Sequence, residues 1–199
     1  MISRPSTLAL LDEVRLLKLY KKILRTERAS LISFLPLWEA SGSVAADLSG
    51  KGCTGAYVNV TLGQPGPGDG RPCAGFDGST SYVDWYSAAL AAAFNGAEGT
   101  VLIHGKVANA GVWADGATVY QAAYLAADNN NNVNLRHYPA NTLGWIYAAG
   151  GTTKTVTLGS LSTLTFFSAA ITWSASADKM IAYYNGAQAG VTQTGLGVW

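Results

Sequence analysis

The sequence predicts an all-β domain with a helix in front of it, and three observations lead to that fold class. Short runs of β-forming residues recur between turn signals spaced about 8–12 residues apart. Glycine is abundant, with 23 of 199 residues, while charged residues make up only 13%. Strands do not alternate with long helical patterns. Together these features favour an antiparallel sandwich or barrel over a helical bundle or an α/β fold.

The helix is predicted over residues 6–28. Leucines and a valine recur there at helical spacing, and Tyr20 widens the apolar stripe that they form. Seven of the 13 Lys and Arg residues lie in the first 28 positions, mostly in the second half of this segment. Positive charge near a helix C-terminus complements the helix dipole. The segment is therefore expected to be an amphipathic helix with a basic polar face.

A stripe this rich in leucine has to be buried, because exposing it would leave a large apolar patch. Three partners are open: the chain's own β-domain, a homo-oligomer or larger assembly, and an anionic membrane surface. Docking in an assembly is favoured over the other two. The residues predicted to form that interface are Leu10, Val14, Leu17, Tyr20 and Leu24.

Ten segments after Pro36 have the composition of short strands. They are residues 56–62, 74–77, 82–85, 100–106, 118–126, 133–138, 145–148, 152–158, 164–173 and 179–185. Residues 128–131 and the pair Gly150-Gly151 lie where hairpin turns are needed, since Asn and Gly tolerate positive φ.

Four segments carry a resemblance to a known family. They read Leu-Trp-Glu-Ala-Ser-Gly at 37–42, Ala-Asp-Leu-Ser-Gly-Lys-Gly-Cys-Thr-Gly at 46–55, Phe-Asp-Gly-Ser-Thr-Ser-Tyr-Val at 76–83, and Ile-Thr-Trp at 171–173 followed by 179–186, which end in Tyr-Tyr-Asn-Gly. In this order they resemble the laminin G-type, concanavalin A-like lectin and glucanase domains. The resemblance covers roughly residues 35–190. It implies a jelly-roll sandwich of two antiparallel sheets, with large aromatic residues packed between or along them. These are Phe76, Tyr82, Trp85, Trp173 and Tyr183.

Two domains are expected, a helical docking segment at 1–34 and the laminin G-like sandwich at 35–199. The family usually continues with further strands after its Tyr-x-Asn-Gly hairpin, whereas this chain stops at Trp199. The last family strands are therefore expected to be missing from the chain, or completed by a neighbouring one. An open sheet edge would invite such pairing.

The two cysteines, Cys53 and Cys73, lie 20 positions apart without a Cys-x-x-Cys partner. That spacing argues against a structural zinc site. Two readings stay open. A disulfide would stabilise the fold by roughly 3 kcal/mol for a loop of this length. Alternatively, both residues are buried thiols.

The acidic residues do not form the arrangement that glycosidases of this fold use. Retaining glycosidases need two carboxyl groups about 5–5.5 Å apart, which on one strand means alternate positions. The acids here are scattered and fall mostly in turns, and no nucleophile elbow, HExxH or P-loop motif is present. We expect no catalysis and no cofactor. Asp115, Asp128 and Asn130 are weak candidates for a calcium site, with a polar turn as the favoured alternative.

Charge and hydropathy limit the partners. Beyond the basic segment the chain is nearly neutral, which argues against nucleic-acid binding. No apolar run is long enough to span a membrane. Asp12 and Glu13 interrupt what would be the apolar core of a signal peptide. We therefore expect a virion or extracellular protein that leaves the cell by another route.

Two functions follow from these expectations. The favoured one is a non-catalytic structural module of a virion, such as a decoration, fibre or tail protein, with the helix docked and the sandwich facing outward. The alternative is a free carbohydrate-binding, lectin-like module, suggested by the resemblance and by the surplus of Trp and Tyr. A glycan is a further ligand under either reading.

Overall fold

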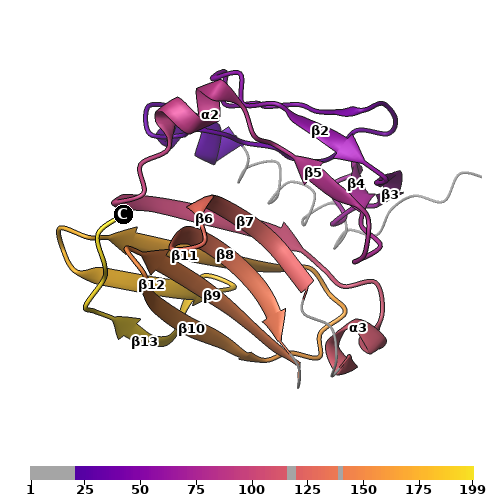
Figure 1. Ribbon diagram of the computed structural model, residues 1–199. Helices are drawn as coiled ribbons and strands as arrows, with labels where there is room; N and C mark the ends of the chain where they lie inside the picture. Colours follow the sequence, from indigo (N-terminus) through magenta and orange to yellow (C-terminus); the bar gives the residue numbers. More distant parts are fainter. Residues whose placement is uncertain (1–20, 116–119, 139–140) are drawn as a thin grey trace, which may run out of the picture. The chain divides into compact units, whose positions relative to one another are not determined.

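The computed structural model describes residues 21–115, 120–138 and 141–199. It is mostly β, with four antiparallel sheets (Figure 1). The chain divides into two compact units, Met1–Phe94 and Asn95–Trp199. The expected boundary between residues 34 and 35 does not coincide with this division and stays a prediction. Among the described residues, no helix is long and apolar enough to cross a membrane.

The first unit contains two small sheets. Strands β1, β2 and β5 form a three-stranded sheet in the order β1-β2-β5, and β3 pairs with β4 in a hairpin. Residues 21–26 are helical, residue 27 lies in a bend and residue 28 in a turn, while residues 6–20 of the predicted helix lie outside the described residues. The elements are β1 Val44–Ala45, β2 Gly55–Val58, β3 Thr61–Pro65, β4 Pro72–Gly75, β5 Tyr82–Asp84 and the short helix α2 Ala88–Ala93.

The second unit has two four-stranded sheets in a sandwich-like arrangement, with orders β13-β12-β11-β6 and β10-β9-β8-β7 (Figure 1). All neighbouring strands are antiparallel. The elements are β6 Glu98–Gly105, α3 Ala110–Ala114, β7 Tyr120–Asp128, β8 Asn131–Tyr138, β9 Thr142–Ala149, β10 Thr152–Ser160, β11 Phe167–Ser174, β12 Lys179–Tyr184 and β13 Ala187–Gln193.

Two glycine-containing turns hold the hairpins of this unit. Gly150 and Gly151 join β9 to β10 with φ values of 55° and 80°, and Asn185 and Gly186 join β12 to β13 with 48° and 83°. Two consecutive positive φ values match a type I′ turn, whose twist suits a two-residue hairpin. The turn at Gly150-Gly151 was predicted from the sequence, and the family resemblance implied a hairpin at Tyr-Tyr-Asn-Gly; both turns are present.

The core of the second unit lies between its two sheets. Strand β11 alternates buried and half-buried residues, and its Trp173 lies 5.9 Å, ring centre to ring centre, from Tyr147 of β9. Both side chains donate a hydrogen bond to the carbonyl oxygen of Gly96, Tyr147 through its hydroxyl at 3.0 Å and Trp173 through its indole N–H at 2.9 Å. Two large aromatic rings can therefore be buried without leaving their polar atoms unsatisfied.

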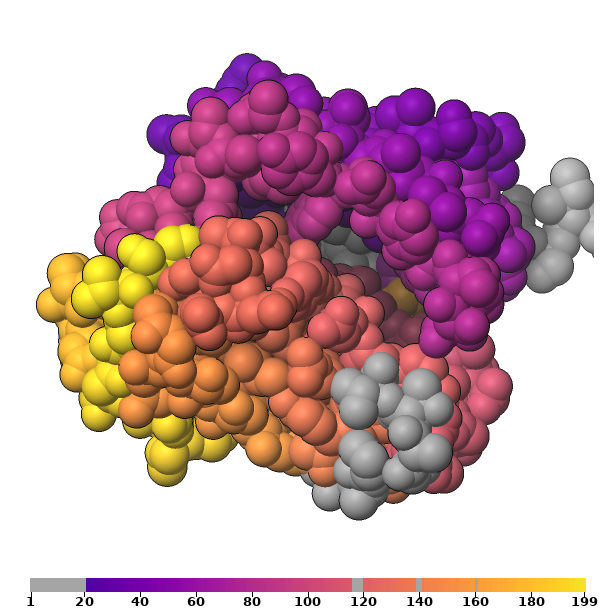
Figure 2. Space-filling model, viewed as in Figure 1, coloured from indigo at the N-terminus to yellow at the C-terminus, as the bar shows by residue number. Residues whose placement is uncertain are grey.

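The last residues of the chain pack along the second unit. The Asp178 carboxylate accepts hydrogen bonds from the backbone N–H groups of Gly195 (2.9 Å) and Leu196 (2.7 Å). In Figure 2 the yellow C-terminal residues lie beside the orange residues of the same unit. A Cβ placed on Gly197 would come within 1.8 Å of the Ala149 carbonyl oxygen, so only glycine allows this close approach.

Most predicted strands are present, with ends shifted by a few residues, and the differences have physical reasons. The run predicted as one strand at 56–62 is split into β2 and β3, because Asn59 adopts a φ of 53° that breaks an extended strand. Strand β13, which follows the Asn185-Gly186 turn, was not predicted. The aromatics expected between or along the sheets separate into two groups, since Trp173 is buried whereas Phe76 and Tyr82 are 45% and 53% exposed.

Candidate functional site

The loop 46–53 of the first unit is organised by one carboxylate, that of Asp47. Its Oδ1 accepts hydrogen bonds from the backbone N–H groups of Phe34 and Ser49, both at 2.9 Å. Its Oδ2 accepts from the Cys53 N–H at 2.9 Å and lies 2.7 Å from the Ser49 hydroxyl. One side chain thereby ties the loop to a segment 13 residues earlier in the chain.

The electrostatics of Asp47 follow from this geometry. Partial burial raises the pKa of the Asp47 carboxyl, but the hydrogen bonds from Phe34, Ser49 and Cys53 outweigh burial, so that its pKa lies below the usual value. The group is therefore ionised at neutral pH, and the N–H groups around it stabilise that charge.

A second acidic contact lies close by in the sequence. Glu39 accepts hydrogen bonds from the Tyr57 hydroxyl at 2.6 Å and from the Ala46 N–H at 2.9 Å. Burial, and then the hydrogen bond to the Glu39 carboxylate and its charge, raise the pKa of Tyr57 above its usual value. Tyr57 therefore stays protonated as a donor and links β2 to the segment that precedes β1.

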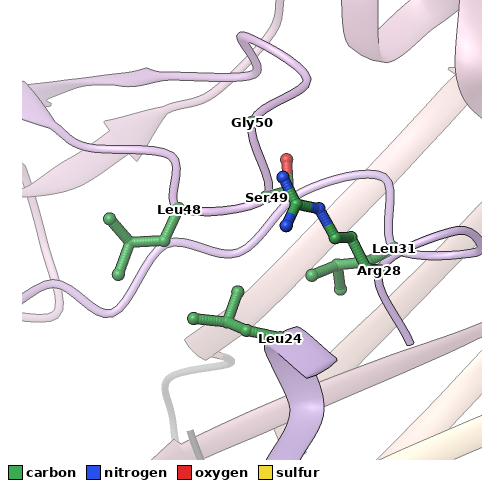
Figure 3. A pocket seen from close by; sticks show the side chains of 6 residues that line it. All are labelled: Leu24, Arg28, Leu31, Leu48, Ser49 and Gly50. Atoms are coloured by element: carbon green, nitrogen blue, oxygen red, sulfur yellow. The ribbon is translucent and has the colours of Figure 1, made fainter. Parts of the chain in front are cut away.

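Next to the Asp47 loop the first unit has an open hollow of about 210 Å³. Three leucines from separate segments, Leu24, Leu31 and Leu48, point into it (Figure 3). Arg28, Ser49 and Gly50 complete the lining. The hollow is smaller than pockets that hold drug-sized ligands, at about 300–1,000 Å³. Its size and its three leucines suit the insertion of an aliphatic side chain.

The hollow includes one of the five residues predicted as an assembly interface, Leu24. The other four, Leu10, Val14, Leu17 and Tyr20, lie outside the described residues. Leu24 belongs to the helical residues 21–26 and is half-buried. The predicted interface thus ends, on its C-terminal side, at an apolar hollow.

The two cysteines are present as thiols and are not joined by a disulfide. Cys53 is fully buried, with its N–H held by Asp47. Cys73 lies on β4, where its Sγ is 3.3 Å from the Pro65 carbonyl oxygen. Of the two readings that the sequence left open, the structure has the one with two thiols, although only Cys53 is fully buried.

The weak calcium candidates do not form one site. The Asp128 carboxylate caps its own hairpin turn, accepting from the Asn130 N–H at 2.7 Å and from the Asn131 side-chain amide. Asp115 accepts a 2.6 Å hydrogen bond from the Tyr120 hydroxyl. Tyr120 and Asp128 are the two ends of β7, roughly 26 Å apart at the usual rise of a strand. Asp115 and Asp128 therefore cannot share an ion, and the described residues include no cluster of three or more His, Cys, Asp or Glu side chains.

The Asp77 carboxylate, like that of Asp47, accepts several hydrogen bonds from its own loop. It accepts hydrogen bonds from the backbone N–H groups of Ser79, Thr80 and Ser81 at 2.8–2.9 Å, and from the hydroxyls of Thr80 and Ser81. The hydrogen bonds from Ser79 and Ser81 hold the pKa of Asp77 well below its usual value. These carboxylates hold loops together, which is the role expected for aspartates in turns.

Several large apolar side chains of the first unit are exposed. Tyr86 is 77% exposed, Tyr82 is 53% exposed and Phe76 is 45% exposed. All three lie within eleven residues of sequence that contain the Asp77 turn. Exposed aromatic rings of this kind offer flat apolar surfaces to a ligand or a partner.

No protein-family model matches the chain, and none of the curated proteins or solved structures matches it. The resemblance to laminin G-type domains therefore stands on the sequence motifs alone.

The sequence indicated that the aspartates lie in turns, but it did not indicate the hydrogen bond between the Asp47 carboxylate and the Phe34 N–H. An aspartate two positions before a Ser or Asn, as in Asp47-x-Ser49, Asp77-x-Ser79 and Asp128-x-Asn130, signals a local turn in which the carboxylate accepts from the backbone. The signal gives the contact with the residue two positions on. It does not give the contact with Phe34, which only the folded unit brings near.

Proposed function

We propose that this chain is a non-catalytic structural module that assembles through its N-terminal segment. Its natural setting would be a virion or an extracellular structure, as a decoration, fibre or tail component. In this proposal residues 1–34 dock, and residues 35–199 form a laminin G-like jelly-roll sandwich that faces outward.

The observation that carries the proposal is the apolar hollow at Leu24, Leu31 and Leu48. Leu24 is the last residue of the stripe that the sequence predicts for residues 10–24, and it lines the hollow, so in this proposal one partner covers both. Burying aliphatic side chains from a partner there would remove apolar surface from water, at about 25 cal/mol per Å² of apolar area. Arg28 at the hollow favours an occupant whose polar rim is acidic.

The non-catalytic part of the proposal is supported by what the acidic side chains do. The Asp47, Asp77, Asp128 and Asp178 carboxylates each accept backbone hydrogen bonds within loops or turns. A general base or nucleophile would instead have to face a substrate-sized cleft. Their lowered pKa values also suit fixed negative charge better than proton transfer at neutral pH.

The test is the mass of the full chain in solution. Light scattering should give a species heavier than the monomer for the wild type. A Leu10→Gln/Leu17→Gln variant should fall to lower mass, because it removes two predicted apolar contacts. The matched control, Lys18→Gln/Lys21→Gln, changes basic positions of the same segment and should keep the wild-type mass. A wild-type monomer, or an equal loss of mass in both variants, would refute assembly through the leucine stripe.

A second candidate function is binding of a carbohydrate, and the exposed aromatics near the Asp77 turn favour it. The apolar face of a sugar ring stacks on an exposed aromatic ring, and Tyr86 is 77% exposed. A glycan array should then find at least one ligand for the wild type, with weaker binding by Tyr86→Ala. The absence of any binding at high protein concentration would count against this candidate.

A further inference from the structure

Strand β6 differs from the other edge strands of the second unit. The two four-stranded sheets end in β6 and β13, and in β7 and β10. The pairings of β7, β10 and β13 with their neighbours each contain a register shift of the kind that a β-bulge produces. In contrast, β6 pairs with β11 in one continuous register over all eight of its residues.

A regular, apolar edge strand is a template for pairing with another strand. Natural proteins usually blunt such edges with bulges, short length or charge, because unpaired N–H and C=O groups attract other chains. Among the described residues, no strand pairs with β6 on the side away from β11. Its centre is the apolar run Val101, Leu102 and Ile103, and Leu102 is 48% exposed. The edge strands β7, β10 and β13 therefore have irregular pairing, whereas the edge strand β6 is regular.

The charges at the two ends of β6 are opposite in sign, so two antiparallel copies of this segment would place opposite charges face to face. Glu98 stands four residues before Leu102, and Lys106 stands four residues after it. If two copies of the strand run antiparallel about a two-fold axis at Leu102, each Glu98 lies opposite the partner's Lys106. Opposite charges facing each other across antiparallel strands stabilise the pair, whereas like charges destabilise it.

The two faces of the strand agree with the same register. Val101 and Ile103 share the face of β6 that carries Ala169 and Ile171 of β11, two fully buried core residues. In the two-fold pair Val101 would lie opposite the partner's Ile103, so the row of β-branched side chains would continue into the second copy. Leu102 would lie opposite the partner's Leu102 on the outer face, where it is half-exposed in one copy.

We infer that β6 is a homodimer interface, in which two copies of this chain join their β13-β12-β11-β6 sheets through antiparallel β6–β6 pairing centred on Leu102. A two-fold contact of this type is closed, so it yields a dimer and not a fibre. The inference goes beyond the proposed function, because it uses a strand of the second unit and not residues 1–34. Both contacts can operate in one assembly.

A charge exchange in the full chain tests the pairing and its register. In Glu98→Lys, the new lysine at position 98 lies opposite the partner's Lys106 in both symmetry-related pairs. In Lys106→Glu, the new glutamate at position 106 lies opposite the partner's Glu98. Each single variant should weaken the dimer by about tenfold, measured by sedimentation equilibrium. The double variant Glu98→Lys/Lys106→Glu restores both pairs and should recover the wild-type affinity. The control Lys179→Glu changes charge on β12, two strands away from the edge, and should leave the affinity unchanged.

Circular dichroism of each variant checks that it is folded. A second measurement does not depend on charge. In a Cys73→Ser background, Leu102→Cys should cross-link to its own copy with a short thiol-specific reagent, since residues on the two-fold axis face each other. Thr100→Cys should cross-link poorly, because its opposite residue is the partner's His104.

Weakened single variants, a restored double variant and selective cross-linking at position 102 would support the β6 pair. The inference would be overturned if the wild type formed no dimer, or if each single variant dimerised as tightly as the wild type. Equal cross-linking at positions 100 and 102 would also overturn it. Loss of mass in the Leu10→Gln/Leu17→Gln variant concerns the other interface, so the two ideas can fail separately.

Discussion

Replacing Asp47 by asparagine should destabilise the first unit, although the substitution changes almost no volume. The carboxylate accepts backbone N–H groups from Phe34, Ser49 and Cys53, and the Ser49 hydroxyl adds a fourth contact. An asparagine has one oxygen, which can keep the two partners of one carboxylate oxygen. The amide NH₂ then faces the remaining donors, and the backbone N–H of Cys53, a fully buried residue, loses its acceptor.

The magnitude follows from those contacts. Leaving one buried donor without an acceptor costs about 1–3 kcal/mol, and the remaining hydrogen bonds lose their charge-assisted strength. Because Asp47 is only partly buried, we expect a loss of about 2 kcal/mol in the free energy of unfolding. Guanidinium unfolding followed by circular dichroism measures it. The matched control is Asp69→Asn, whose carboxylate accepts only the Arg71 N–H, at 3.1 Å, among the bonds described.

Labelling of the Cys53 thiol gives a local readout in a Cys73→Ser background. Cys53 is fully buried, so it reacts only when the Asp47 loop opens. A loss of about 2 kcal/mol corresponds to labelling roughly 30 times faster in Asp47→Asn. If Asp47→Asn unfolds and labels like Asp69→Asn, the assignment of Asp47 as the organiser of this loop is refuted.

The pH dependence has a definite sign. The folded-state pKa of Asp47 is lowered, so its ionised form contributes stability above the unfolded-state pKa of about 3.9. That contribution is lost as the pH falls through the lower, folded-state value. The difference in stability between the wild type and Asp47→Asn should therefore be constant near neutral pH and should shrink below about pH 4.

Three further substitutions test other parts of the fold by thermal unfolding. Gly96→Ala should cost about 1–3 kcal/mol and shift the tryptophan emission, since the new Cβ would come within 2.0 Å of the Trp199 ring; unchanged emission would contradict that packing. Gly186→Ala should cost about 1–2 kcal/mol, because its φ of 83° is unfavourable for any residue with a Cβ, and a neutral result would argue against the type I′ turn. His137→Phe should be neutral or stabilising, since the buried ring nitrogens of His137 have no hydrogen-bond partner among the described residues and a phenyl ring has nothing to satisfy. A loss above about 2 kcal/mol would reveal a polar contact for that imidazole.

The sequence was most informative where local chemistry decides the structure. Gly150-Gly151 and Asn185-Gly186 predicted hairpins because few residues other than Gly and Asn accept positive φ, and both hairpins are present. The strand predicted at residues 152–158 is present as β10, and its alternate residues Val156 and Leu158 are both buried. In these cases the information lies within a few neighbouring residues.

Elements whose own residues have weak structural propensity were missed. Strand β13 reads Ala-Gln-Ala-Gly-Val-Thr-Gln, which has weak β-propensity, and it is a strand because β12 pairs with it. In contrast, helix α2 had a usable local signal, since Ser87 precedes an alanine-rich run and caps the Leu90 N–H. The same division applies to the candidate site. The contact of Asp47 with the Ser49 N–H is local, while the bond to Phe34 and the hollow between Leu24, Leu31 and Leu48 arise from segments that only the fold brings together.

The measurement that tests the central claim most directly is the mass of the full chain as a function of concentration. Sedimentation of the wild type beside the Leu10→Gln/Leu17→Gln variant and its lysine control would provide it. A module that assembles through its N-terminal segment predicts a wild type and a lysine control heavier than the monomer at micromolar concentration, and a leucine variant of lower mass. A wild type that remains monomeric at every concentration, with all three proteins folded, would contradict the claim.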